Sequence, residues 1–246
     1  MKFFELTTKL NTMETSELNS ILKRLRSLGD PKAIEGMARF GITTTKAFGV
    51  SAPVLKQMAR EIGKNHGLAQ ELWSTGVLEA RGIAALIDEP SKVTEKQIEQ
   101  WVKDFDNWAV CDGCCMNLFD RTIFAWKKAS EWSQRKREYE KRAGFALMAV
   151  LAVHDKEAED KKFLSLLPII RREAIDERNF VRKAVNWALR QIGKRSLELN
   201  KKAIETAKEI QKLDSPSARW VASDALRELR SAAVQRRLLK KKKRAS

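Results

Sequence analysis

The sequence contains little of what builds secreted, membrane-embedded or β-sheet proteins. Among its 246 residues there are three cysteines, two histidines, one tyrosine and five prolines. No apolar run approaches the roughly 18 residues that a membrane-spanning helix needs, so we expect no membrane partner. The first residues, Met1 to Glu5, lack the apolar core and small-residue cleavage site of a signal peptide. These absences predict a soluble, cytoplasmic protein.

Signals for β-strands are also nearly absent. The chain shows no sustained alternation of apolar and polar residues, and Asp112-Gly113 does not separate two β-rich runs. Helix signals recur instead. Thr15 or Ser16 can cap a first helix that Gly29 ends, and Asp30-Pro31 restarts a helix that ends at Gly41. The pattern predicts an all-α protein.

Three further features mark later helices. Ser51 and Pro53 open a helix that we expect to run to about His66-Gly67. Pro90 then breaks the chain, and Thr94 with Gln97 forms a capping box for the helix after it.

The three cysteines lie together as Cys111, Cys114 and Cys115. An odd, clustered set argues against a disulfide framework and for a reducing compartment. Cys111-x-x-Cys114 also suggests zinc, but a closed zinc site needs about four ligands, and His66 and His154 each stand alone. On a helix the three thiols have the spacing of a packed stripe, which favours a core role and no bound metal.

Positive charge dominates the chain. The sequence has 48 Lys and Arg against 32 Asp and Glu, a net charge of +16. We therefore expect a polyanionic partner. Residues 236–246 are predicted to be a disordered tail, serving either as a non-specific phosphate tether or as an inert solubilising segment. Its cations are Arg236, Arg237, Lys240, Lys241, Lys242, Lys243 and Arg244.

A weak internal repeat runs through the helices. The segment from Arg182 to Arg190 matches the segment from Arg219 to Arg227 in spacing, at an offset of 37 residues, and the stretches starting at Arg81 and Arg142 are looser relatives. A repeat near 40 residues, with alanines where helices cross, is typical of antiparallel helix pairs stacked as a solenoid. We expect one such domain over residues 1–235, with a concave basic face that suits duplex DNA or RNA.

Three segments carry residues that are unusual for a plain core. Trp108 and Asp112 would share one face of a helix, one turn apart. Arg142 and Trp187 lie in two of the repeat-like segments. Taken singly, each has an ordinary interpretation: a core indole with a solvated carboxylate, an inter-helix arginine and a packing tryptophan.

Together, these segments resemble the AlkD-type family of DNA alkylation repair glycosylases, which are built from HEAT-like repeats. The resemblance covers most of residues 30–230. It begins with Phe48-Gly49-Val50-Ser51-Ala52-Pro53-x-Leu55 and is most specific in Asn107-Trp108…Asp112 and in Val185-Asn186-Trp187-Ala188-Leu189-Arg190. The chain departs from the family's pattern at Ala109 and at Ser51-Ala52, which bears on lesion preference.

The resemblance implies a function and a set of site residues. Trp108, Asp112 and Trp187 map onto the catalytic cleft, and Arg142 and Arg190 onto contacts with the DNA backbone. The family removes N3-methyladenine and N7-methylguanine without a base-flipping pocket, leaving an abasic site. It uses no metal or organic cofactor. The expected partner is double-stranded DNA carrying alkylated bases, bound by a monomer without an obligatory protein partner and associated with the nucleoid in a bacterium.

Two other functions stay open on the sequence. A non-catalytic repeat protein could bind DNA structures or RNA through the same basic face, with an affinity that falls steeply with salt. A HEAT-like adaptor could instead bind acidic proteins, and it would bind nucleic acid weakly even at low salt.

Overall fold

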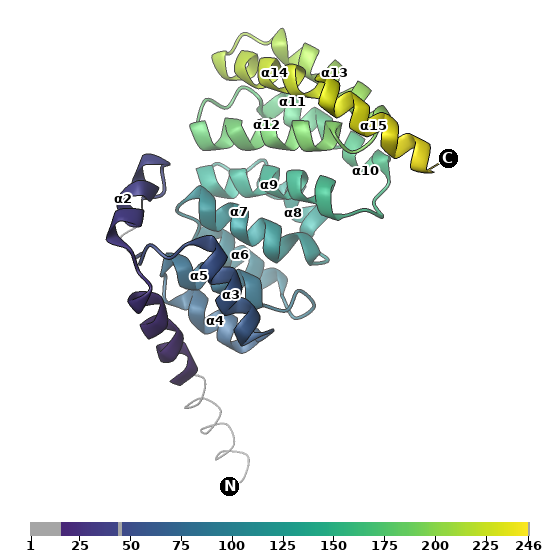
Figure 1. Cartoon of the computed structure of the whole chain (residues 1–246). Coiled ribbons are helices and arrows are strands. Elements are labelled where there is room, and N and C mark those ends of the chain that lie inside the picture. Colours follow the sequence, from purple (N-terminus) through teal and green to yellow (C-terminus); the bar gives the residue numbers. More distant parts are fainter. Residues whose placement is uncertain (1–15, 44–45, 246) are drawn as a thin grey trace. The chain divides into compact units, whose positions relative to one another are not determined.

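The computed structural model describes residues 16–43 and 46–245, and these residues form helices joined by turns (Figure 1). No strand occurs in these two ranges, so the prediction of an all-α protein is confirmed. The contacts divide the chain into two compact units, with boundaries at Gln97, Phe105 and Leu118. The single domain over 1–235 and its concave basic face stay predictions.

The first unit contains five helices that follow residues 16–27, which are also helical. They are α2 (Pro31–Arg39), α3 (Ala52–Ile62), α4 (His66–Ser74), α5 (Leu78–Ile87) and α7 (Trp108–Asn117). Helix α5 packs against α3, α4 and α7, so it forms the centre of this unit.

The second unit contains the rest of the described chain. Helix α6 (Glu95–Lys103) crosses from the first unit into the second at Gln97. The elements that follow are η1 (Phe119–Arg121), α8 (Ala125–Trp132), α9 (Glu138–His154), α10 (Asp160–Leu164), α11 (Leu167–Glu173), α12 (Asn179–Gly193), α13 (Leu197–Gln211), α14 (Pro216–Leu229) and α15 (Ala232–Ala245). Helix α9 is the most buried of them and packs mainly against α12 and α8.

Several helix boundaries agree with the capping signals in the sequence. The Asp30 carboxylate accepts the N–H of Lys32 at 2.9 Å, next to a proline in the first turn of α2. The Thr94 hydroxyl accepts the N–H of Gln97 at 3.1 Å. One predicted boundary is wrong. Helix α3 ends at Ile62 and not at His66, because Gly63 adopts a φ of 79° and turns the chain away.

Helices α12 and α14 run parallel in a fixed register. The Arg182 guanidinium lies 5.1 Å from the centre of the Trp220 ring, and Asn186 donates to Asp224 at 2.8 Å. Arg190 pairs with Glu228 one turn further along. Each pair is 38 residues apart, with α13 as the returning helix. This structural offset agrees with the 37-residue repeat in the sequence.

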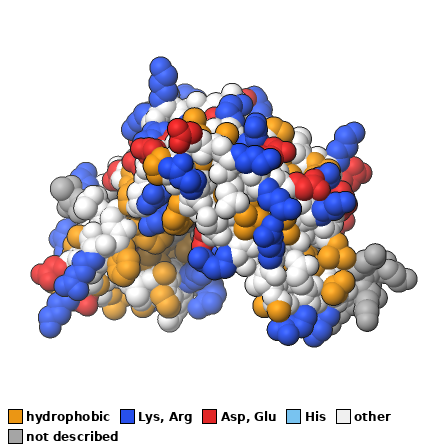
Figure 2. Space-filling model, turned by 90° about the horizontal axis from the view of Figure 1, so that it is seen from above, with side chains coloured by type: hydrophobic (Ala, Val, Ile, Leu, Met, Phe, Trp, Pro, Cys, Tyr) orange, Lys and Arg blue, Asp and Glu red, His pale blue; other side chains and the backbone are white. Residues whose placement is uncertain are grey.

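The basic C-terminal segment differs from its prediction. Residues 236–245 continue helix α15 as far as Ala245, where the sequence suggests disorder. Val234 and Leu238 are buried on one side of this helix, so packing holds a segment whose like charges oppose order. Figure 2 shows many Lys and Arg side chains on the face seen from above, with fewer Asp and Glu.

In the ranges that the structure describes, no helix is both long and apolar enough to cross a membrane.

Candidate functional site

Helix α7 places Trp108 and Asp112 on one face, as predicted. The Asn107 side chain starts the helix by accepting the N–H groups of Ala109 and Val110, both at 3.0 Å. Trp108 is therefore the first helical residue, and Asp112 follows one turn later. Both side chains are half-buried. Their outer atoms therefore reach solvent, while the atoms near the backbone are held by the fold.

The Trp108 ring is fixed by a hydrogen bond outside its own helix. Its indole N–H donates to the backbone carbonyl of Phe40, just after α2, at 2.9 Å. This bond leaves the ring faces to contact other groups and removes the indole donor from hydrogen bonding with a ligand.

The three thiols of α7 belong to the core of the first unit. Cys111, Cys114 and Cys115 are buried and free of disulfides, as the sequence predicted. Burial raises the pKa of Cys114 and Cys115 well above that of an exposed thiol. Such thiols are poor nucleophiles and metal ligands. Within the described residues, no three His, Cys, Asp or Glu side chains gather as a metal site.

The loop before α3 is held by a buried carboxylate. Glu79, only 1% exposed, accepts the N–H groups of Phe48, Gly49 and Val50 at 3.0, 2.7 and 3.2 Å. Gly49 has a φ of +84°, and a Cβ there would lie 2.2 Å from the carbonyl oxygen of Asp30. Backbone geometry thus requires glycine at position 49.

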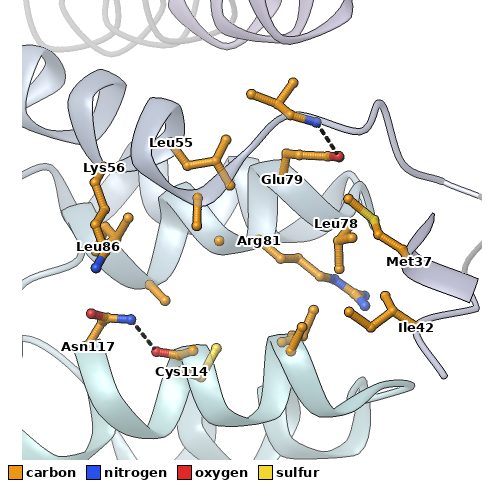
Figure 3. A pocket seen from close by; sticks show the side chains of 17 residues that line it. Met37, Ile42, Leu55, Lys56, Leu78, Glu79, Arg81, Leu86, Cys114 and Asn117 are labelled. Carbon is orange, nitrogen blue, oxygen red and sulfur yellow. Dashed lines mark hydrogen bonds between the residues drawn. The ribbon is translucent and has the colours of Figure 1, made fainter. Parts of the chain in front are cut away.

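A cavity of about 240 Å³ lies between α2, α3, α5 and α7 (Figure 3). Its walls are mostly apolar, from side chains such as Ile42, Leu55 and Leu78, and the Arg81 side chain points into it. On α7 the lining residues are Ala109, Val110, Gly113, Cys114 and Asn117. Trp108 and Asp112 are not among them, so the candidate catalytic pair faces a different side of the helix.

The other predicted site residues lie in the second unit. Trp187 is half-buried on α12, at the centre of the segment that carries the resemblance. Arg142 on α9 is only 7% exposed, and its guanidinium donates to the backbone carbonyl of Phe180 at 2.6 Å. This bond joins α9 to the start of α12. In the structure, Arg142 therefore makes a bond between helices. Its contact with a DNA phosphate stays a prediction.

Arg190 is also engaged by the protein. It pairs with Glu228 and lies 3.6 Å from Asp224, both on α14. Burial raises the pKa of Glu228, but Lys194 and Arg190 outweigh this effect, and the net pKa is lowered. Arg190 could bind a phosphate only in competition with this carboxylate, so its DNA contact also stays a prediction.

Sequence reasoning did not single out the contact between Arg182 and Trp220. The Trp220 side chain is 38% exposed beneath the Arg182 guanidinium, an arrangement that suits a surface contact with an anion or a planar group. The signal was present, since both residues belong to the two matching repeat segments.

Comparison with known proteins gives the class of this helical array. A family model described as DNA alkylation repair enzyme matches residues 21–229, so the chain belongs to that family. The chain is 25% identical over 214 residues to the uncharacterized protein Lin0241 of Listeria innocua serovar 6a, covering 86% of this chain and 87% of that one.

A solved structure confirms the HEAT-like fold. It belongs to a protein described as a member of "a new family of proteins related to the HEAT-like repeat DNA glycosylases with affinity for branched DNA structures". The TM-score is 0.72 at 20% identity, with 86% of this chain and 95% of that chain covered. At this identity the likeness concerns the fold.

Proposed function

We propose that this protein is a monofunctional DNA glycosylase that hydrolyses the N-glycosidic bond of cationic alkylpurines in duplex DNA. The observation that carries the proposal is the pair on α7. Asp112 and a tryptophan whose ring is held by Phe40 share one face, in a chain of the DNA alkylation repair family. N3-methyladenine and N7-methylguanine are the lesions we expect, and the product is an abasic site.

The chemistry needs little from the protein. Alkylation at N3 or N7 gives the purine a positive charge, so the base leaves as a neutral molecule when the bond from N9 to C1′ breaks. The deoxyribose then carries the developing positive charge, which the Asp112 carboxylate stabilises electrostatically. Water adds its oxygen to C1′ and releases one proton. No step of this sequence requires a metal, an organic cofactor or a lysine.

The tryptophans would select the charged base. The face of an indole attracts a cation by about 0.5–2 kcal/mol, which favours an alkylated purine over a neutral one. The Trp108 ring suits this role because its N–H is already bonded to Phe40, which leaves its faces as the contact surface. We expect the Trp187 ring to pack against the sugar and backbone and to attract the cation through its face in the same way.

The test is incubation of the full-length protein with duplex DNA carrying N7-methylguanine, with free methylpurine and abasic sites measured together. We expect release above the spontaneous rate. Asp112→Asn should lower the single-turnover rate by about 10²–10³-fold while DNA affinity is retained. The control is Asp214→Asn, which alters a fully exposed carboxylate and should leave the rate unchanged. Equal rates in wild type and Asp112→Asn would refute the role of this carboxylate.

A second candidate is a non-catalytic protein that binds DNA structures. Two observations favour it: the affinity for branched DNA stated for the solved relative, and the protein contacts that occupy Arg142 and Arg190. It predicts no base release from methylated duplex. It also predicts tighter binding to a four-way junction than to a linear duplex of equal length.

A further inference from the structure

The C-terminal helix α15 is a docked element of the second unit. Val234 and Leu238 are 7% and 1% exposed, so its apolar side lies against the protein. Gln235 adds hydrogen bonds to the side-chain oxygen of Asn200 at 3.1 Å and to the carbonyl of Leu229 at 2.7 Å. These contacts tie α15 to α13 and α14, beside which it lies in Figure 1.

The outer side of α15 carries only positive charge. Arg236, Arg237, Lys240 and Lys241 are exposed and follow one another at helical spacings of one, three and one residues, which gives two adjacent rows on one face. Across residues 16–43 and 46–245, no carboxylate forms an ion pair with any of these four side chains. Their charge is therefore left for solvent or for a ligand.

Other cations converge on the same helix. The Lys241 ammonium lies 3.5 and 3.4 Å from the backbone carbonyls of Lys194 and Arg195, at the end of α12. Burial lowers the pKa of Lys241, and repulsion from Arg237, Lys156 and Arg195 lowers it further. Folding thus brings like charges together at a cost that a bound anion would offset.

A hollow of about 530 Å³ lies beside α15, where Gln235 lines it together with residues of α13 and with Arg230 at the end of α14. Lys201, Lys208 and Arg230 line it, and all three are exposed. The carboxylate in its lining, Glu205, is paired with Lys202 at 2.9 Å. The hollow therefore adds three more cations whose charge is little compensated.

We propose that this C-terminal basic surface binds the phosphate backbone of duplex DNA, in addition to the contacts made at the candidate active site. We define the surface as Lys201, Lys208, Arg230, Arg236, Arg237, Lys240 and Lys241. The proposal rests on the proposed function only for the identity of the polyanion. Lysine and arginine side chains without aromatic neighbours give sequence-independent contacts, and each neutralised phosphate releases counterions.

An anionic membrane fits this surface less well than DNA. A helix that lies in a bilayer interface inserts a broad apolar face, whereas the apolar face of α15 is used against the protein. Leu239, at 53% exposed, is the large hydrophobic side chain that α15 leaves outside. We therefore expect no strong binding to vesicles.

The test uses the full-length protein with Arg236→Gln, Arg237→Gln and Lys240→Gln combined, changes that keep helix propensity and remove three charges. The matched control is Lys103→Gln, Lys136→Gln and Lys212→Gln, three exposed lysines of the second unit outside this surface. The dissociation constant for an undamaged 20-base-pair duplex is measured by fluorescence anisotropy between 50 and 300 mM KCl. Circular dichroism first checks that both variants keep the wild-type helix content.

We expect the slope of log affinity against log salt to become shallower by about 2–3 in the α15 variant, since each lost phosphate contact removes about 0.9. The control should change the slope by less than about 1. Equal changes in the two variants, or an unchanged slope in the α15 variant, would overturn the proposal. The proposal would also be overturned if the α15 variant lost binding to phosphatidylserine vesicles while its DNA binding stayed intact. If the wild type excises no methylpurine but the two variants show the expected slope changes, the proposed function is refuted and this inference stands.

Discussion

Replacing Glu99 by Gln should lower the free energy of unfolding by about 2–3 kcal/mol at neutral pH. The Glu99 carboxylate on α6 receives three charged or polar donors from the second unit. Lys128 and Trp132 donate to it at 2.8 and 3.0 Å, and Arg135 donates at 2.6 Å. Lys128 is 4% exposed, so its charge depends on carboxylate partners for compensation.

The magnitude follows from the pKa of Glu99. Burial raises this pKa, but the hydrogen bonds from Lys128, Trp132 and Arg135 outweigh it and hold the pKa at about 2, against a usual 4.5. A difference of this size corresponds to about 3.4 kcal/mol. The side chain is 24% exposed, and screening by water reduces the figure to about 2–3 kcal/mol.

The pH dependence has a definite sign. A carboxyl group with a lowered pKa stabilises the folded state in full above its unfolded value of 4.5. The stabilisation is lost as the pH falls from 4.5 towards 2. The difference between wild type and Glu99→Gln should therefore be constant from pH 6 to 8, and about 1 kcal/mol smaller at pH 3.5.

Urea unfolding followed by circular dichroism at these pH values measures the difference. Glu205→Gln is the control, because this carboxylate pairs with Lys202 at the surface and both side chains are more than 40% exposed. Its unfolding midpoint should match that of wild type. A Glu99→Gln midpoint equal to that of wild type at pH 7, or a difference that grows on acidification, would refute the reasoning.

Two further predictions concern a backbone position and a candidate DNA contact. Gly49→Ala should destabilise the protein by roughly 2–4 kcal/mol, because its φ is positive and its Cβ would meet the Asp30 carbonyl. The control is Gly36→Ala, where nothing lies within 4 Å of the new Cβ, and it should be neutral or stabilising by about 0.5–1 kcal/mol. Thermal melting compares the two variants, and equal losses of stability would contradict the argument. Glu228→Gln should tighten binding to duplex DNA several-fold if Arg190 contacts a phosphate, since its carboxylate competitor is removed. The control in an anisotropy titration is Glu209→Gln, which removes an exposed carboxylate paired with Arg171. Equal affinities of the two variants for DNA would show that Arg190 has a structural role.

The sequence predicted much of the fold because helix signals are local. Capping residues such as Asp30 and Thr94 act within one turn, and a 37-residue repeat reports stacked helices directly. The helix end at Ile62 was missed because the sequence does not show which of Gly63 and Gly67 takes a positive φ. The order of α15 was missed because it depends on Val234 and Leu238 meeting α13 and α14, a tertiary contact that a run of lysines conceals.

The candidate site was predictable only in part. The shared face of Trp108 and Asp112 follows from a spacing of four residues, and the buried thiols follow from the same periodicity. The bond from Trp108 to Phe40 spans 68 residues, and the partners of Arg142 and Arg190 lie 38 residues away. Such contacts depend on how helices pack, so no local pattern could reveal that these two arginines are already engaged.

The engagement of Arg142 and Arg190 changes where the affinity for DNA should come from. A guanidinium that must break a hydrogen bond to a backbone carbonyl or an ion pair with a carboxylate gains less free energy when it binds a phosphate. Among the described residues, no carboxylate competes for the cations of α15, and only Lys241 contacts backbone carbonyls. Phosphate binding to Arg236, Arg237 and Lys240 therefore replaces water and counterions. We therefore expect the salt dependence of binding to follow α15 more than α9 and α12, and the selectivity for charged bases to follow Trp108 and Asp112. Affinity and catalysis would then be separable by mutation in this protein.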